Sequence, residues 1–411
     1  MGVKNYHSLL TIPEPLDLVI VSVPRSITPK ILEDCIKKNV AVVHFFTAGF
    51  TETGTKEGQE LEEYLVRRAT EVSLPVIGPN CMGIYNPRIG LRQTIEQKVG
   101  VDGSVGFISQ SGTHAENFAK EGYYQGVYVD KSVSYGNGSV LDSTDFLEYF
   151  GQDESIKVIG MYVEGIKDGR RFFRLLKMIT QKKPVVIWKG GHTEAGGRAI
   201  ASHTASLAIP SNIWSAIVKQ AGAIQVDSFM ELIDTLKILI MANPIISDRV
   251  GIIGGSGGES VVIADKFAGA GLRVPSLTQE SYDQFAEFFS VVGGSFRNPV
   301  DNGNVSRMFL KRTIEILERD NNIDNLVVQL SLLPDDWLGH GSLDNDVDSL
   351  IHLRQRTLKP IIVIIPTVGM SLNQIEATIT IQKRLQDGLI PVLNSIERGA
   401  QALSNVLPDQ S

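Results

Sequence analysis

The sequence has very little cysteine and no long apolar run. Its 411 residues include two cysteines, Cys35 and Cys81. Two thiols so far apart do not form a metal site by themselves or indicate a disulfide framework, so we expect both to be buried and inert. No run of about 18 apolar residues occurs, and the N-terminus lacks the charged-then-apolar pattern of a signal peptide. The sequence therefore predicts a cytoplasmic protein that does not cross a membrane.

Basic clusters and several common catalytic motifs are also absent. The net charge is −7, and no block of Lys and Arg is present, which argues against nucleic acid as a partner. The P-loop, the GxSxG elbow, the HExxH zinc motif and paired CxxC motifs do not occur. We therefore expect no metal site, and any ATP chemistry would need a nucleotide-binding segment on another chain.

Short apolar runs alternate with helical patterns along the whole chain. The hydrophobic content of 43% is ordinary for a globular protein, and the length suggests two or three domains. Residues 16–23, 40–46 and 75–77 are predicted strands, and 27–39 and 59–72 are predicted helices. Continuous Val- and Ile-rich strands joined by helices are typical of parallel sheets covered on both faces. This first part is expected to form about half of a doubly wound nucleotide-binding domain.

Four sequence signals occur twice, in the same order. The pairs are 105–112 with 250–257, 157–163 with 325–331, 183–187 with 359–363, and 221–226 with 387–392. This repetition predicts two copies of a flavodoxin-like, doubly wound parallel-sheet domain. We therefore predict three α/β domains, at residues 1–97, 98–245 and 246–411.

One histidine lies in an unusual setting within the first copy. His203 is surrounded by small and hydroxyl residues in the segment 197–208, after a glycine-rich stretch. Small neighbours let a charged group approach an imidazole, which can act as a nucleophile toward phosphorus. A histidine that only packs or caps a turn is the alternative. The corresponding part of the second copy, 366–370, has no histidine, which favours a site-specific role.

Two further elements are candidates for the same site. Ser109, Gln110, Ser111, Gly112 and Thr113 stand where a strand turns into a helix, and a helix N-terminus attracts anions. A plain strand-to-helix turn is the alternative, as it is for the similar glycine-rich turn at 254–258. Glu164 ends a predicted strand and would hydrogen-bond His203, unless it is only a solvent-facing carboxylate at the sheet edge.

These motifs together resemble the α subunit of ADP-forming acyl-CoA synthetases, such as acetate–CoA synthetase, in the succinyl-CoA synthetase superfamily. The segments that carry the resemblance are 78–83, 109–113, 162–170, 202–204 and 298–301. The resemblance implies a Rossmann-like CoA-binding domain followed by two flavodoxin-like ligase domains. It begins after the family's first strand and glycine-rich turn, so a truncated CoA-binding domain lacking about one βαβ unit is expected. Such a loss would expose a sheet edge and the apolar faces beside it.

The resemblance also implies an activity. The family converts acyl-CoA, ADP and phosphate to a carboxylic acid, CoA and ATP through an acyl phosphate and a phosphohistidine. Here His203 would carry the phosphoryl group, Glu164 would orient it, and the turn at 109–113 would hold the phosphoryl oxygens. The partners implied are a small carboxylic acid, CoA, and an ATP-grasp β subunit that binds ATP or ADP with Mg²⁺ in a hetero-oligomer. The implied CoA-binding positions are Val23, Pro24, Ala48, Gly49, Phe50, Glu52 and Asn80.

The sequence departs from the family pattern beside the histidine, and a rival function follows from the expected truncation. Ala205 and Ile209 stand where the family usually has glycine. The rival is a non-catalytic protein that binds CoA or acyl-CoA and regulates a partner. A flavin-binding protein is a third possibility, which rests on fold analogy alone.

Overall fold

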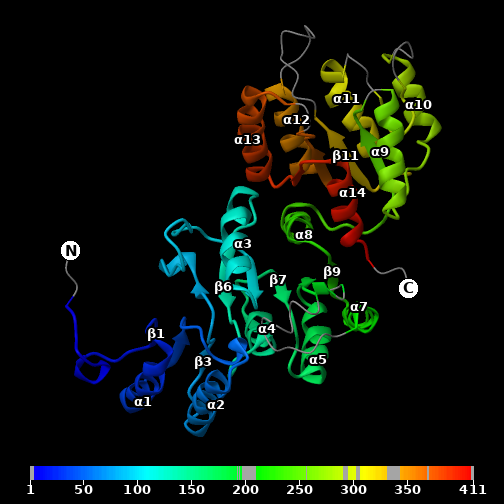
Figure 1. Ribbon diagram of the computed structural model, residues 1–411. Helices are drawn as coiled ribbons and strands as arrows, with labels where there is room; N and C mark the ends of the chain where they lie inside the picture. The colour runs from blue at the N-terminus through cyan, green and yellow to red at the C-terminus, as the bar shows by residue number, and fades with distance from the viewer. Residues whose placement is uncertain are drawn as a thin grey trace. The chain divides into compact units, whose positions relative to one another are not determined.

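The computed structural model describes residues 4–191, 193, 195–196, 210–255, 257–289, 295–301, 306–330, 343–367 and 370–408. The chain divides into two compact units, Met1–Ser228 and Phe229–Ser411 (Figure 1). Each unit is built mainly from parallel strands that alternate with helices. Within the described residues, every helix is too short or too polar to act as a membrane-spanning segment.

The first unit begins with a three-stranded parallel sheet in the order β1-β2-β3. Its strands are β1 (Leu18–Val21), β2 (Val42–Phe45) and β3 (Val76–Ile77), and its helices are α1 (Thr28–Lys38) and α2 (Lys56–Glu71). These strands lie within the predicted segments. Helix α1 has proline in its first turn, where the missing N–H costs nothing, and ends at Asn39 in the left-handed conformation. Val21, Leu32 and Phe45 belong to the core between sheet and helices.

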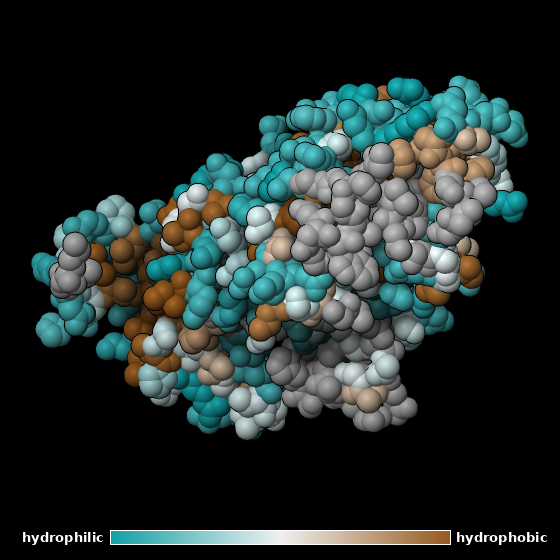
Figure 2. All heavy atoms as spheres, turned by 90° about the horizontal axis from the view of Figure 1, so that it is seen from above, coloured by the Kyte–Doolittle hydropathy of each residue, from teal (hydrophilic) through white to brown (hydrophobic). Residues whose placement is uncertain are grey.

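One edge of this sheet and part of one face are exposed. Among the described residues β1 pairs only with β2, and the side chains of Ile20 and Phe46 are 52% and 44% exposed. Both residues line a hollow of about 110 Å³ together with Ile84 and Leu91. Figure 2 shows apolar surface gathered over the N-terminal part of the chain, which lies at the left in both views. Part of this face is therefore apolar and exposed, which is unusual for a parallel sheet.

A six-stranded sheet forms the rest of the first unit, in the order β4-β6-β5-β7-β8-β9. The strands are β4 (Gly83–Tyr85), β5 (Val105–Ser109), β6 (Val129–Ser134), β7 (Val158–Val163), β8 (Val185–Lys189) and β9 (Ile224–Val226). The helices are α3 (Gly112–Tyr124), α4 (Ser143–Gln152), α5 (Gly169–Thr180) and α7 (Ser211–Gln220). Apart from the antiparallel strand β4, the order is that of a flavodoxin-like sheet, and every residue of β7 is buried.

The second unit contains a four-stranded parallel sheet in the order β10-β11-β12-β13. The strands are β10 (Val250–Ile253), β11 (Asn325–Gln329), β12 (Ile361–Ile364) and β13 (Val392–Leu393). The helices are α8 (Phe229–Met241), α9 (Gly258–Gly269), α10 (Gln279–Ala286), α11 (Ser306–Arg319), α12 (Leu343–Arg356), α13 (Leu372–Asp387) and α14 (Ile396–Asn405). Two isolated parallel bridges, Arg249 with Arg273 and Ile253 with Val300, involve β10 or the residue before it.

The four repeated sequence signals lie on equivalent strands. They correspond to β5, β7, β8 and β9 in the first unit and to β10, β11, β12 and β13 in the second, and the spatial order is the same in both sheets. The predicted fold class is therefore confirmed: a Rossmann-like part followed by two flavodoxin-like domains. The domain boundaries at 97/98 and 245/246 stay predictions.

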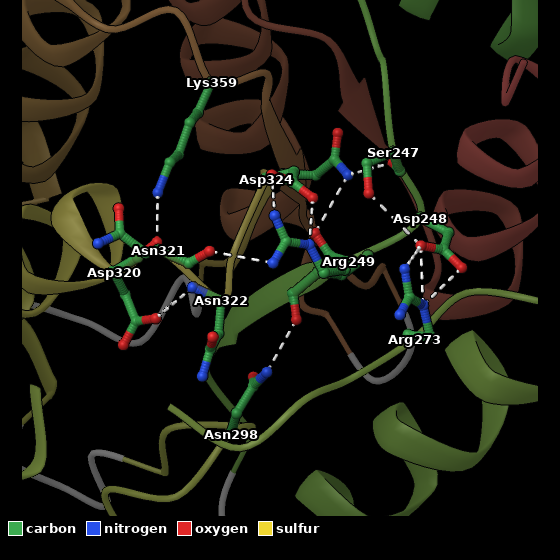
Figure 3. Close-up of polar contacts among 12 residues, drawn as sticks. Ser247, Asp248, Arg249, Arg273, Asn298, Asp320, Asn321, Asn322, Asp324 and Lys359 are labelled. Carbon is green, nitrogen blue, oxygen red and sulfur yellow. Dashed lines mark hydrogen bonds and ion pairs between the residues drawn. The ribbon is translucent and has the colours of Figure 1, made fainter. Parts of the chain in front are cut away.

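Ion pairs and hydrogen bonds of charged side chains connect the segments at the amino ends of the strands in the second unit (Figure 3). Arg249, just before β10, binds both carboxylate oxygens of Asp324, just before β11, at 2.6 and 2.8 Å. Arg273 binds Asp248 in the same two-oxygen manner, and Lys359 Nζ donates to the Asp320 carbonyl at 2.8 Å. These contacts stabilise the sheet at one end, whereas the carboxyl ends are where such sheets bind ligands.

We predict that Asp320→Ala lowers the local stability of the second unit around α10. The Asp320 carboxylate is 2% exposed and accepts hydrogen bonds from Thr278, Ser281 and the Asn322 N–H. Burial raises the pKa of Asp320, but these hydrogen bonds outweigh it and hold the pKa below its usual value. Loss of the acceptor should cost about 1–3 kcal/mol of local stability. Hydrogen exchange of α10 should accelerate, and Asp283→Ala, on the exposed face of that helix, is the control.

The same carboxylate has a pH dependence with a definite sign. Because its pKa is lowered in the folded state, its stabilisation is complete above the unfolded pKa, about 4, and disappears as pH falls through the folded value. Acidification from pH 5 should therefore lower the protection factors of α10, corrected for the intrinsic exchange rate at each pH, more in the wild type than in Asp320→Ala. An equal fall in protection in the two proteins would contradict this assignment.

Candidate functional site

A cavity of about 690 Å³ lies in the first unit, where loops that follow β1, β2, β3 and β5 meet. The carboxyl ends of parallel strands collect their following loops at one edge, which explains why distant segments share this cavity. The residues that line it are Ser22, Val23, Pro24, Arg25, Phe46, Thr47, Ala48, Asn80, Cys81, Met82, Gln110, Ser111, Gly112, Thr113 and Gly136. A volume of this size is typical of a small-molecule or cofactor site.

The cavity brings together residues from both predicted binding sets. Of the predicted CoA positions, it includes Val23, Pro24, Ala48 and Asn80, and of the predicted phosphate positions, Gln110, Ser111, Gly112 and Thr113. Ser109, a predicted phosphate position, and the predicted CoA positions Gly49, Phe50 and Glu52 are not on its wall.

Gly49, Phe50 and Glu52 belong to one loop, which is held by hydrogen bonds between its own residues. Phe50 is fully buried, and the Glu52 carboxylate accepts hydrogen bonds from the Gly49 and Phe50 N–H groups at 2.6 and 3.1 Å. Glu52 therefore holds the shape of the loop that carries Ala48, and its carboxylate does not line the cavity.

The turn after β5 is built by its own serines. Ser109 is buried and its hydroxyl donates to the Ser111 carbonyl at 2.6 Å, while Ser111 Oγ accepts the His114 N–H at 3.3 Å as the cap of α3. A Cβ at Gly112 would lie 2.7 Å from Met82 Cγ, so glycine permits close contact between this turn and the loop after β3. The N-terminus of α3, with its partial positive charge, thus begins at the cavity wall.

Gln110 joins this turn to Glu164. Its side-chain oxygen accepts the backbone N–H groups of Glu164 and Gly165 at 2.9 and 3.2 Å, and the Tyr135 hydroxyl at 3.3 Å. Its own N–H donates to the Tyr162 carbonyl at 3.0 Å. Gln110 therefore fixes the end of β7 against the end of β5, in addition to lining the cavity.

Glu164 is only 5% exposed, so the alternative of a solvent-facing carboxylate does not hold. The Tyr162 hydroxyl donates to Glu164 Oε1 at 3.2 Å, and the Lys189 ammonium donates to the Glu164 carbonyl at 2.8 Å and to the Gly190 carbonyl at 2.7 Å. A Cβ at Gly190 would lie 2.8 Å from the Tyr162 hydroxyl and 3.5 Å from Glu164 Cγ. The end of β8 therefore packs directly on the Glu164 side chain.

Charged and aromatic groups around Glu164 influence one another. The His114 ring packs against Tyr162 and Trp188, with centroids 4.4 and 4.6 Å apart. Burial lowers the pKa of His114, and the Glu164 carboxylate partly offsets that shift. Burial also lowers the pKa of Lys189, again against the influence of Glu164. This end of the sheet is therefore poorly hydrated: burial disfavours the charged forms of His114 and Lys189, and the Glu164 carboxylate partly offsets that effect.

The predicted phosphoryl acceptor, His203, lies outside the described residues. The chain enters the segment that carries it directly after β8, and the Gly190 N–H donates to the Val163 carbonyl, the residue before Glu164, at 2.9 Å. Gly190 therefore lies beside the end of β7, and the pairing of Glu164 with His203 stays a prediction.

Sequence reasoning missed Arg25, Tyr162, Lys189 and Gly136. Arg25 is the one ionised side chain among the described residues that line the cavity, and it directly follows two predicted positions. Lys189 ends the strand next to Glu164, a position that would have identified it. Gly136 reaches the wall only through tertiary packing. Cys81 lines the cavity, but burial raises the pKa of its thiol to about 12, so the thiol is protonated at neutral pH.

The equivalent turn in the second unit has a different partner. The Gly257 N–H, at the start of α9, donates to Asp301 Oδ2 at 2.7 Å, and Asp301 is buried. Asn298 of the same motif bonds the Val250 and Pro275 carbonyls. In the second unit the Asp301 carboxylate thus accepts a hydrogen bond from the glycine-rich turn. Among the described residues, no group of three or more histidine, cysteine or acidic side chains is arranged to hold a metal ion.

Comparisons with known proteins agree with this arrangement. Residues 102–239 match the family model of the succinyl-CoA ligase like flavodoxin domain, and residues 1–87 match that of a CoA binding domain. ADP-forming acetate–CoA ligase I of Archaeoglobus fulgidus is 36% identical over 80% of this chain, and the α subunit of ADP-forming acetate–CoA ligase II of Pyrococcus furiosus is 37% identical over 79%. The match spans about half (48%) of the first protein and 71% of the second.

A solved structure is similar over almost the whole chain. The dinucleotide forming acetyl-coenzyme A synthetase 1 of Ca. Korarchaeum cryptofilum, in complex with phosphate and ADP, superimposes with a TM-score of 0.85 at 28% identity. The match covers 99% of this chain and 85% of that one.

We predict that Gln110→Ala disturbs the site locally. Three donors would lose their common acceptor in a buried environment, which should cost about 1–3 kcal/mol. Hydrogen exchange at the amides of Glu164 and Gly165 should accelerate, while Thr113→Ala, which removes another side chain of the same turn, should leave them protected. Unchanged protection in Gln110→Ala would contradict the role given to its side-chain oxygen.

Proposed function

The chain belongs to the family of ADP-forming acetate–CoA ligases, and from that membership we propose that it is the α subunit of an ADP-forming acyl-CoA synthetase. The proposed reaction converts acyl-CoA, ADP and phosphate to a carboxylic acid, CoA and ATP. The observation that carries this proposal is the shared cavity: it joins four of the seven predicted CoA positions to the turn at the start of α3, and Gln110 in that turn bonds the Glu164 N–H.

The first chemical step would take place in this cavity. A phosphate oxygen attacks the thioester carbonyl, the carbon–sulfur bond breaks, and the CoA thiolate leaves and takes up a proton. The N-terminus of α3 and the hydroxyls of Ser111 and Thr113 are suited to hold phosphate oxygens, because positive dipoles and donors favour anions. The products of this step are an acyl phosphate and CoA.

His203 would then take the phosphoryl group. An imidazole nitrogen attacks phosphorus, the bond to the carboxylate oxygen breaks, and the carboxylic acid is released. Glu164 would hydrogen-bond the other ring nitrogen, which fixes the tautomer and stabilises the positive charge that develops on the ring. Burial of Glu164 strengthens that interaction, because little solvent screens it.

An ATP-grasp β subunit would complete the reaction. ADP attacks the phosphohistidine and regenerates the free imidazole, with Mg²⁺ supplying charge neutralisation at the nucleotide on that subunit. The absence of a P-loop from the sequence supports a separate nucleotide site, and the relatives named as α subunits support a partner. We propose a hetero-oligomer in the cytoplasm with a small carboxylic acid as substrate.

The chemistry of the cavity wall fits CoA. Arg25 is held at the wall by the Gly49 carbonyl, 2.7 Å from Nη1, and by the Glu57 carboxylate, 2.5 Å from Nη2. Arginine is well suited to bind phosphates, and CoA carries several. The hydroxyls of Ser22 and Thr47 and the apolar side chains of Phe46 and Met82 complete a wall that matches a ligand with both polar and apolar parts.

We predict that His203 becomes phosphorylated. Incubation of the chain with acetyl-CoA and ³²P-phosphate should yield protein-bound label that is acid-labile and base-stable, as a phosphoramidate is. His203→Asn should abolish the label, whereas His352→Asn, a histidine in the second unit, should retain it. Label that persists in His203→Asn would contradict His203 as the acceptor, whereas no label from protein that binds acetyl-CoA would favour the non-catalytic CoA-binding alternative.

We predict that Arg25→Gln weakens CoA binding. Loss of a charge-assisted contact to phosphate should raise the Kd for CoA about 10-fold or more, as measured by isothermal titration calorimetry. Pantetheine, which lacks phosphate, should bind both proteins equally. Lys56→Gln removes a positive charge from the exposed start of α2 and is the control for a general electrostatic effect. An unchanged Kd for CoA in Arg25→Gln would exclude Arg25 as a phosphate ligand.

A further inference from the structure

A group of polar side chains joins the two sheets of the first unit beside the cavity. Asn137 lies in the loop between β6 and α4, Glu52 in the loop after β2, and Glu62 on α2. The Asn137 amide nitrogen donates to Glu52 Oε2 at 2.7 Å and to Glu62 Oε2 at 2.9 Å. These contacts link residues 85 and 75 positions apart in the sequence.

We propose that Asn137 is a positioning residue that sets the separation of the cavity walls and thereby controls the affinity for the CoA part of the substrate. This inference rests on the proposed function. Glu52 bonds the N–H groups of Gly49 and Phe50, so the loop that carries Ala48 is fixed by the same carboxylate that Asn137 holds. Gly136, adjacent to Asn137, also lines the cavity. One amide group therefore connects two loops that both contribute to the cavity wall.

The amide is chemically suited to this position. A side-chain NH₂ group offers two donors from one nitrogen without a charge, so it can bond two carboxylates at once. Two carboxylates close together would otherwise repel each other, which favours protonation of one of them. Glu62 also accepts the Thr51 N–H at 3.0 Å and the Ser139 hydroxyl. The hydrogen bonds outweigh burial and lower the pKa of Glu62, so this carboxylate stays ionised.

Backbone hydrogen bonds also hold the loop that carries Asn137 close to the loop after β3. Asn137 and Ser139 donate their N–H groups to the Pro79 and Gly78 carbonyls, both at 3.1 Å. A Cβ at Gly136 would lie 2.3 Å from the Asn80 and Pro79 carbonyl oxygens, so glycine is required for this approach. On the other side of the loop, Lys167 Nζ donates to the Gly138 carbonyl at 2.6 Å. The loop that carries Asn137 is thus held by contacts on both sides. The Asn137 side chain connects it to Glu52 and Glu62, which belong to the part of the chain that forms the first sheet.

The test separates ligand affinity from chemistry. Asn137→Ala should raise the Kd for CoA, and the half-saturating acetyl-CoA concentration for His203 labelling, about tenfold or more, because two charge-assisted hydrogen bonds are lost. The maximal label at saturating acetyl-CoA should stay at the wild-type level. Ser139→Ala is the matched control, since it removes one contact of the same loop to Glu62 but leaves the bridge to Glu52, and its Kd should not change.

A second variant keeps the test decisive if Asn137→Ala does not fold. Asn137→Asp has the same shape but places a third carboxyl beside Glu52 and Glu62, with Lys167 as the neighbouring cation on the loop. CoA binding should be weak at pH 8 and recover as the pH falls toward 5, because a protonated carboxyl restores one donor. The wild type should lack this recovery.

The outcomes are distinguishable. A wild-type protein that does not bind CoA would overturn both the proposed function and this inference. If the wild type binds CoA and both Asn137 variants bind it equally well at pH 8, the inference alone is wrong. A loss of label at saturating acetyl-CoA would also contradict it, because Asn137 would then affect the chemical step.

Discussion

Strands that are buried on both faces present polar groups to a ligand mainly at their ends, and this constraint organises the candidate site. All six residues of β7 are buried, and Glu164 is the first side chain beyond that strand. The same geometry places Thr47 after β2 and Gln110 after β5 on the wall of one cavity. At the amino ends of the second unit's strands, by contrast, charged groups such as Arg249 and Asp324 satisfy one another. The residues of the candidate site therefore follow the carboxyl ends of strands in the first unit, whereas these ion pairs stabilise the amino ends of strands in the second unit.

Burial at the carboxyl ends makes each hydrogen bond there important. Glu164 is almost without solvent contact, so its neighbours must replace water: Gln110 accepts its N–H, Lys189 donates to its carbonyl and Tyr162 donates to its carboxylate. An ionised group in such surroundings interacts strongly with a charge that develops nearby. The proposed phosphoryl transfer needs this property, because its difficulty lies in the handling of charge more than in the making of bonds.

The two flavodoxin-like domains differ in the surroundings of the turn that follows the first strand of each sheet repeat. In the first unit the turn at Ser111 and Gly112 lies on a cavity wall, whereas in the second unit the Gly257 N–H bonds the buried Asp301 carboxylate. The second fold needs no ligand at this turn, since its own side chain serves as the acceptor. The cavity of the first unit also depends on a second sheet, because the residues that follow β1, β2 and β3 supply most of its wall.

Much of this protein follows from the sequence alone. Apolar runs identified the strands, and the repeated signals identified two equivalent sheets, because local hydrophobic pattern determines which segments are buried. Glu164 and the turn at 109–113 were found for the same reason: they directly follow such strands. His203 was selected by its neighbours and by its absence from the second copy, and its role stays a prediction.

Only the tertiary structure decided the directions of the side chains and the contacts between distant segments. Glu52 follows a strand as a ligand-binding residue would, yet its carboxylate turns back to its own loop. Gln110 lines the cavity, but its oxygen faces Glu164. The bridge from Asn137 to Glu52 joins residues 85 positions apart. Periodicity carries information about burial and not about which partner a polar group meets, because that choice depends on how separate elements pack together.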